Sequence, residues 1–356
     1  MRLLLILSLL ALSFVGALAQ APQFEMVKVT EGIYAAIRKE PPGLTVNANS
    51  VFIINQDDIV VIDTTLTPAT AKEELAALRK LTDKPVTFVI NTHWHDDHIM
   101  GNQVYRDAFP KVEFIAHAQT RAYLPTTGLT NRQQAMSPDG YPGFIKFLRG
   151  TLEKNVGPNG KALTEEERTT LASDLKIAES YMAENPKVEI VLPTIALEDR
   201  LTLYRGDREI DIRYLGRGHT SGDIVVYLPK EGIVAAGDLV IWPVPYVGGP
   251  QSHPADWKRS LDTLLELQAS IIIPGHGPVL RDDSYVKLMS KLFATITEQV
   301  GEAVRRGETL EQTRKGMQLS DLRTAFAGES EMRKLIFGSY VIGPAVEAAY
   351  RDATAK

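Results

Sequence analysis

The sequence of 356 residues contains no cysteine. Without cysteine the chain can form no disulfide and cannot carry a lipid on an N-terminal cysteine. Any nitrogen or sulfur ligand to a metal is then expected to be a histidine, of which the chain has seven.

An excess of positive charge is also lacking, since 39 lysines and arginines face 44 aspartates and glutamates, for a net charge of −5. A protein with this balance does not attract polyanions, so nucleic acid is not an expected partner. At 44% hydrophobic and 23% charged residues, the composition is that of an ordinary globular protein.

Long apolar runs are absent after residue 19. Before it, a short positive start precedes an almost wholly apolar stretch over 3–18, and Ala-Leu-Ala at 17–19 has the form of a signal-peptidase site. We expect residues 1–19 to be a signal peptide cleaved after Ala19, giving a periplasmic or secreted protein with a net charge of −6 and no membrane association. An uncleaved anchor is the weaker alternative, because the run is short for a span and no charged stop follows.

Apolar segments of strand and helix periodicity alternate along the chain, which predicts an α/β fold. The predicted strands are 26–30, 32–38, 47–54, 59–63, 85–91, 112–116, 188–192, 201–204, 210–215, 224–228, 233–236 and 271–273. The predicted helices are 67–81, 101–109, 164–183, 255–268 and the region from 283 onward.

The alternation of strand and helix periodicity is interrupted at about 123–187. Glycine and proline cluster there before a helix that starts with a capping sequence at Thr164. We interpret this region as a helical insertion, either a lid and substrate wall or surface padding. The main domain is predicted to span 20–282, and residues 283–356 to form a helical extension packed on it.

Residues 91–100, Asn-Thr-His-Trp-His-Asp-Asp-His-Ile-Met, hold three of the seven histidines. His93 and His95 follow an apolar strand and would point the same way, while Asp97 and His98 come where the chain turns. Burying all of these polar groups without a partner is costly, and a metal removes that cost. Imidazole and carboxylate together indicate a two-metal centre. A surface loop rich in histidine and aspartate is the alternative.

Further ligands downstream would favour the metal centre, and three candidates occur at strand ends beside glycine. They are His219 in Gly-His-Thr, Asp238 in Ala-Gly-Asp and His276 in Pro-Gly-His-Gly. Glycine allows the tight bends and close backbone approach that a metal site needs.

The motifs HWHDDH, GHT, AGD and PGHG, in this order over about residues 25–280, resemble the metallo-β-lactamase superfamily. The resemblance implies a four-layer αββα sandwich with metals at one edge of its two sheets. It implies a first metal held by His93, His95 and His219, a second held by Asp97, His98 and His276, and Asp238 bridging both.

The expected activity is that of an exported binuclear zinc hydrolase, with two Zn²⁺ per chain, Fe or Mn being possible instead. Two such ions lower the pKa of a bridging water to about 7, and the resulting hydroxide, oriented by Asp97, would attack a lactone, ester, thioester or β-lactam carbonyl of a small molecule. The alternatives are a mononuclear iron oxygenase of the same fold and a non-catalytic periplasmic metal-binding protein.

Four other residues are weaker candidates, among them His253 in a Gly-Pro-Gln-Ser-His-Pro loop, which is either a pocket-lining or an ordinary loop residue. The resemblance implies that Asp63, at a strand end, orients a ligand histidine. Asp223 either orients His219 or caps a turn, and Arg217 is either an anion-binding or a plain surface residue. Dedicated β-lactamases of this family have a cysteine at the position of Asp238 and a lysine shortly after it. Here the position holds an aspartate, and the apolar residues Leu239, Val240 and Ile241 follow it. The chain is therefore closer to the general hydrolases that have a bridging aspartate.

Overall fold

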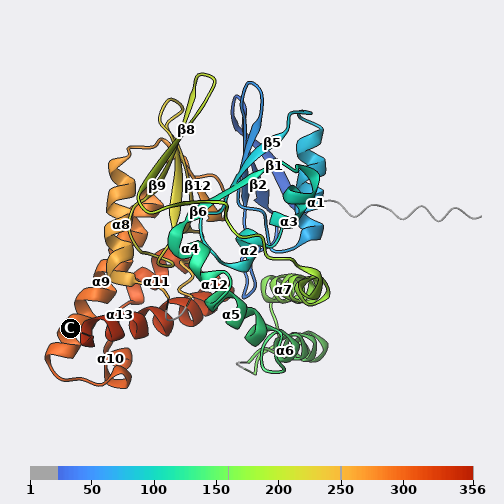
Figure 1. Ribbon diagram of the computed structural model, residues 1–356. Coiled ribbons are helices and arrows are strands. Elements are labelled where there is room, and N and C mark those ends of the chain that lie inside the picture. The colour runs from blue at the N-terminus through green and yellow to red at the C-terminus, as the bar shows by residue number, and fades with distance from the viewer. Residues whose placement is uncertain (1–22, 159, 249–250, 356) are drawn as a thin grey trace, which may run out of the picture.

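The computed structural model describes residues 23–158, 160–248 and 251–355, so the predicted signal peptide lies outside the described residues. Two β-sheets face each other, and helices cover both outer faces (Figure 1). This arrangement confirms the predicted αββα sandwich. Within the described ranges, no helix is long and apolar enough to span a bilayer.

The first sheet has seven strands in the order of the sequence, antiparallel from β1 to β4 and parallel from β4 to β7. These strands are β1 (Phe24–Thr30), β2 (Ile33–Arg38), β3 (Ser50–Ile54), β4 (Ile59–Ile62), β5 (Val86–Ile90), β6 (Glu113–His117) and β7 (Ile195–Leu197). The switch to parallel strands places helices between them, and the carboxyl ends of β4, β5 and β6 meet at one edge.

The second sheet has five strands in the order β12-β11-β10-β9-β8, antiparallel except for the parallel pair β11 and β12. Its strands are β8 (Arg200–Arg205), β9 (Arg208–Tyr214), β10 (Ile224–Leu228), β11 (Ile233–Ile241) and β12 (Ile271–His276). The two last strands extend beyond their predicted ends, so Asp238 and His276 lie within strands rather than just after them.

Three apolar layers hold the sandwich together. The layer between the sheets is built from alternate residues of both, including Ile53, Val60, Ile212 and Val226. Helices α1 (Pro68–Arg79) and α3 (Asn102–Ala108) cover the first sheet, and α8 (Pro254–Glu266) and α9 (Ser284–Arg305) cover the second (Figure 1). Each side chain leaves water by facing a neighbouring layer, which is the main favourable term in folding.

The region after β6 is helical and lies beyond the sheet edge, below it in Figure 1. It contains α4 (Ala118–Tyr123), α5 (Thr127–Ala135), α6 (Tyr141–Lys154), α7 (Glu165–Glu184) and the 3₁₀ turn Asn185–Lys187. Thr164 forms the predicted capping box with Glu167 at the start of α7.

The C-terminal helices continue along the second sheet and turn back toward the insertion. After α9 come α10 (Leu310–Gly316), α11 (Ser320–Ala327), α12 (Glu331–Phe337), the π-helical turn Gly338–Ile342 and α13 (Pro344–Thr354). Their apolar residues join one cluster with α8 and α9. The domain boundaries given above stay predictions.

The strand predicted at 188–192 is wrong, because this segment has no ladder partner. Val188 and Ile190 pack with the insertion, whereas Val191 packs under the first sheet. The alternating apolar residues of this segment therefore pack into two separate clusters instead of forming one face of a strand. The strand at this edge is the short β7, which follows Pro193.

Candidate metal centre

The loop that follows β5 lies at the edge of the sandwich, between the two sheets. It continues into α2 (Asp96–Ile99), and the backbone carbonyl of His98 accepts hydrogen bonds from the Thr64 N–H at 2.9 Å and the Asn91 amide at 3.2 Å. The Asn91 and Asn102 amides also bind each other. This buried amide network fixes the loop because each of its polar groups would otherwise be unpaired.

One group of polar atoms gathers around His93, His95, His219 and Asp238. His219 Nε2 lies 2.8 Å from His95 Nδ1 and 3.3 Å from Asp238 Oδ2. His93 Nε2 lies 3.9 Å from the same Asp238 oxygen. Four ligand atoms thus face one point, and they come from the loop after β5, the loop after β9 and strand β11.

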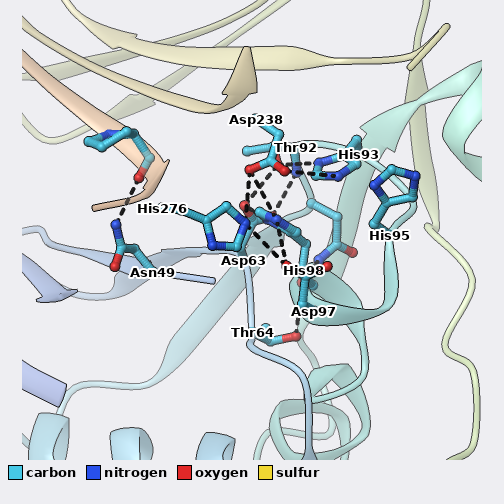
Figure 2. Close-up of polar contacts among 12 residues, drawn as sticks. Asn49, Asp63, Thr64, Thr92, His93, His95, Asp97, His98, Asp238 and His276 are labelled. Atoms are coloured by element: carbon cyan, nitrogen blue, oxygen red, sulfur yellow. Dashed lines mark hydrogen bonds and ion pairs between the residues drawn. The ribbon is translucent and has the colours of Figure 1, made fainter. Parts of the chain in front are cut away.

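A second group contains Asp97, His98 and His276 (Figure 2). His276 Nε2 lies 3.2 Å from Asp97 Oδ2, and His98 Nε2 lies 3.5 Å from that oxygen. Asp238 Oδ1, the oxygen not directed at the first group, lies 3.2 Å from His98 Nε2 and 3.4 Å from His276 Nε2. One carboxylate therefore turns one oxygen toward each group.

The polar atoms that face these two points are poorly paired within the protein. His93 Nε2, His98 Nε2, Asp97 Oδ2 and Asp238 Oδ1 are buried and have no hydrogen-bond partner among the described residues. Leaving buried polar atoms unpaired costs roughly 1–3 kcal/mol each. Nitrogen and carboxylate oxygen are the donors that zinc prefers, so the residues fit two divalent ions.

Burial and the nearby carboxylates divide four of these histidines into two kinds. Burial lowers the pKa of His93 well below its usual value and that of His95 to about 3, so both are neutral imidazoles. Burial opposes the cation at His98 and His276 too, but Asp238 and Asp97 outweigh it. They raise the pKa of His276 to about 9 and that of His98 well above its usual range.

Asp63 contacts the second group through His98, the kind of ligand histidine that the resemblance implies it orients. Its Oδ2 lies 2.7 Å from His98 Nδ1, and the carboxylate also accepts the Thr92 N–H and hydroxyl, both at 2.8 Å. A carboxylate behind a ligand histidine fixes the tautomer and the direction of the ring. His219 is fixed similarly, since its Nδ1 lies 2.9 Å from the Tyr246 carbonyl oxygen.

Gly237, before Asp238, is required by close packing. It has φ +50°, and a Cβ atom there would lie 2.5 Å from the Thr92 Cβ. A larger residue would therefore push β11 away from the loop that carries the histidines.

A cavity of about 250 Å³ opens at the two groups. His95, Asp97, His219, Asp238 and His276 line its floor. Its walls include Tyr141 and Tyr181 from the insertion and Tyr246 after β11. Burial raises the pKa of Tyr246 to about 12, so its phenol stays protonated and can donate a hydrogen bond.

The other sequence candidates lie outside this cavity. Asp223 accepts the Thr220 N–H at 2.8 Å and its hydroxyl at 2.7 Å, so it caps the turn after His219. Arg217 forms an exposed ion pair with Asp256. His253 Nε2 pairs with the Ser221 hydroxyl at 2.8 Å.

Sequence reasoning missed two kinds of residue near the site. The tyrosines Tyr141 and Tyr246 stand in segments without a recognisable motif. Asn49 donates its side-chain amide to the carbonyls of Pro274 and Gly277, at 3.0 and 2.9 Å, and so holds the loop of His276 (Figure 2). A single asparagine gives no pattern that a sequence could reveal, and its partners lie in the other half of the chain.

Comparison with known proteins gives one family. The model of the Metallo-beta-lactamase superfamily matches residues 44–276. The linear primary-alkylsulfatase of Pseudomonas sp. (strain ATCC 19151) is 24% identical over 262 residues, which cover 71% of this chain and 46% of that protein. The chain thus spans about half the length of this relative. The metallo-beta-lactamase type 2 of Bacillus cereus is 24% identical over 241 residues, 67% of this chain and 70% of that protein.

Solved structures share the fold. The DIM-1 metallo-beta-lactamase superposes with a TM-score of 0.51 at 21% identity, covering 77% of this chain and 98% of that chain. The FIM-1 enzyme of Pseudomonas aeruginosa, in its mono-zinc form, gives 0.51 at 17% identity, covering 76% and 95%.

Proposed function

The chain belongs to the metallo-beta-lactamase superfamily, and from that premise we propose that it is a binuclear zinc hydrolase of a small molecule. The observation that carries the proposal is Asp238, whose two oxygens face the two groups of histidine and aspartate atoms. His93, His95 and His219 would hold one ion, and Asp97, His98 and His276 the other. When bound, two divalent ions supply Lewis acidity and an activated water at neutral pH.

The chain's own residues prepare the cavity for a polar reacting group. Asp97 presents a carboxylate at the floor and can orient a proton of the attacking water or of the leaving group. The protonated phenol of Tyr246 lines the same cavity and can donate to a developing oxyanion. The ring of Tyr246 packs against that of Tyr340, with ring centroids 4.0 Å apart, so the phenol is held in place before a substrate binds.

Several substrate classes fit the proposal: lactones, esters, thioesters, β-lactams and, from the named alkylsulfatase relative, sulfate esters. Leu239, Val240 and Ile241, which follow Asp238, are buried in β11 and offer no cation for a β-lactam carboxylate. This supports a general hydrolase over a dedicated β-lactamase.

The decisive experiment combines metal analysis of the purified protein with a chromogenic panel of nitrocefin, a lactone, a thioester, an ester and a sulfate ester. We expect two zinc ions per chain and hydrolysis of at least one substrate. His95→Ala and Asp97→Asn should lower kcat/KM by at least a hundredfold with an unchanged circular dichroism spectrum, because each removes a group at the cavity floor.

His253→Gln is the matched control, since this histidine lies outside the cavity and should keep its rate. Full activity of Asp97→Asn would contradict the site assignment. One iron per chain would instead select an oxygenase, and tight zinc binding with no turnover on the whole panel would select an accessory metal-binding protein.

We also propose export, on the basis of the apolar run and cleavage sequence in residues 1–19. N-terminal sequencing of the protein from a host with a secretion pathway should begin at Gln20. A cytoplasmic protein that retains Met1 would contradict this proposal.

A further inference from the structure

A second cavity, of about 260 Å³, lies beside the one at the metal centre. The two cavities have four wall residues in common: Val46, Ile241, Tyr246 and His276. Because one set of side chains borders both spaces, the second cavity adjoins the first at His276.

The second cavity is walled mainly by apolar side chains from three parts of the chain. They include Pro41 and Pro42 between β2 and β3, Trp242 and Val244 after β11, and Ile336 of α12. Apart from His276, the charged residues in the wall are Arg38 and Glu40, which form an ion pair with each other. The space is therefore suited to an uncharged hydrocarbon rather than to an anion or a sugar.

The walls of this cavity are held by contacts that do not depend on a ligand. The guanidinium of Arg333 lies 4.8 Å from the ring centroid of Trp242. Trp242 packs over Gly277, which has φ +97° and where a Cβ atom would lie 2.6 Å from the Trp242 Cβ. A side chain at position 277 would therefore displace the indole.

The segment of Pro41 and Pro42 is fixed from both sides. Asp174 of α7 accepts the backbone N–H groups of Leu44 and Thr45, both at 3.0 Å, and the Tyr340 hydroxyl donates to the Leu44 carbonyl at 2.5 Å. The insertion and the C-terminal helices thus both help to shape the second cavity, which is consequently preformed.

We propose that this cavity binds the hydrocarbon chain of the substrate, so that the enzyme acts on esters or related compounds with an unbranched alkyl or acyl tail. This inference rests on the proposed hydrolase function and adds a substrate class to it. An apolar cavity of about 150 Å³ accepts benzene, so by proportion one of 260 Å³ accommodates a tail of roughly ten carbons.

The first test measures kcat/KM of the zinc-loaded full chain on p-nitrophenyl esters from acetate to dodecanoate, each below its solubility limit. Burial of each methylene is expected to raise kcat/KM about three- to fourfold, up to roughly ten carbons, after which the profile levels off. Hydrolysis with a flat profile, or one that falls with chain length, would overturn the proposal.

Substitutions in the wall should change the preferred length. Ile336→Trp fills the cavity and should lower the ratio of decanoate to acetate rates at least tenfold, whereas Ile336→Ala enlarges it and should shift the optimum to longer chains. Leu335→Trp is the matched control: this neighbour is 42% exposed and is not part of the wall. An unchanged ratio in both folded Ile336 variants would contradict the proposal.

A binding measurement separates this inference from the hydrolase itself. In the chelator-treated full chain, 10-bromodecanol should quench the fluorescence of Trp242, while decanol and bromoethanol should not. The quenching should disappear in Trp242→Phe. Quenching without hydrolysis of any ester would support the cavity and contradict the hydrolase, whereas hydrolysis without quenching would do the reverse.

Discussion

At the scale of single residues, Asp63 is the strongest case of a side chain that acts through another. Its backbone has φ +56°, an unfavourable conformation for a residue other than glycine, which its three hydrogen bonds help to maintain. The strain is tolerated where it aims a carboxylate at His98. Asp63 is thus a positioning residue, and its effect should appear first in metal affinity.

We predict that Asp63→Ala weakens the binding of one of the two zinc ions by roughly 10- to 100-fold, because His98 loses the partner that fixes its ring. Competition with a fluorescent chelator measures this directly. Asp211→Asn is the control, since Asp211 is equally buried but pairs with Arg200 and Arg213 in the second sheet. Equal zinc affinity in Asp63→Ala and the parent would refute the role.

Residues of the candidate metal centre could be named from the sequence because their chemistry is unusual for a protein interior. His93, His95 and His98 crowd into one short stretch that a core would not tolerate without a metal. Asn49 and Tyr246, by contrast, are ordinary residues in ordinary surroundings. Their contacts form only when segments far apart in the sequence pack against each other.

At the scale of elements, α1 carries a buried carboxyl group. Glu74 is fully buried against the first sheet, 3.6 Å from the Arg38 guanidinium, which is itself paired with Glu40. Burial raises the pKa of Glu74 to about 7, although the charge of Arg38 partly opposes this. The folded protein therefore binds this proton more tightly than the unfolded chain does.

The contribution of Glu74 to stability is consequently complete below about pH 4.5 and is lost as the pH rises through 7. The loss amounts to about 3 kcal/mol. Glu74→Gln should be more stable than the parent at pH 8, with little difference at pH 4.5, in urea unfolding. Glu73→Gln, on the exposed side of the same helix, should show no such dependence. An equal difference at both pH values would refute the assignment.

The insertion is joined to the metal loop by Asp96. Arg132 of α5 donates to its Oδ1 at 3.0 Å, and the hydroxyl of Tyr181 in α7 donates to its Oδ2 at 2.8 Å. Tyr181 also stacks on Tyr141 of α6, with ring centroids 4.6 Å apart. Helices α5 and α7 therefore meet at the carboxylate next to Asp97, and α6 is joined to them through Tyr181.

We predict that Arg132→Met destabilises the insertion by about 3 kcal/mol, because it leaves the largely buried charge of Asp96 without its cation. Hydrogen exchange should become faster in α5–α7 and remain unchanged in the two sheets. Arg149→Met serves as the control, since Arg149 and its partner Glu179 are both exposed. Uniform protection in Arg132→Met would show that Asp96 does not hold the insertion.

Elements with clear periodicity were predicted well. The strand at 224–228 has the predicted ends, and most others differ by a few residues. The strand at 188–192 was predicted wrongly, and the packing of the insertion was not predicted at all, for the same reason. In both regions the structure depends on tertiary contacts that local periodicity does not reveal. Asp174, for instance, faces Thr45, which lies 129 positions earlier.

At the scale of the whole molecule, the C-terminal helices are part of the core. Phe293 of α9 stacks on Trp257 of α8, with ring centroids 4.5 Å apart, and both are fully buried. Val286 and Met289 are buried on the same side of α9. Without α9 to α13 the outer face of the second sheet would lose most of its cover.

We predict that a chain ending at residue 282 aggregates, because it exposes a large apolar surface on α8 and β11. Size-exclusion chromatography with light scattering checks this. Removal of residues 352–356 alone should leave the protein monodisperse to the same degree as the parent. A soluble, cooperatively unfolding 1–282 chain would show that the extension is dispensable.

The hold of Asn49 on the His276 loop has a consequence for the order of assembly during synthesis. The amide joins the residue just before β3 to carbonyls 225 and 228 positions later, and the Gly275 carbonyl accepts the Asn49 N–H at 2.8 Å. A nascent chain that has emerged only as far as β11 lacks both His276 and the partners of Asn49. The proposed second ion would thus find all of its ligands only after β12 has docked, so its loading would report the docking of β12.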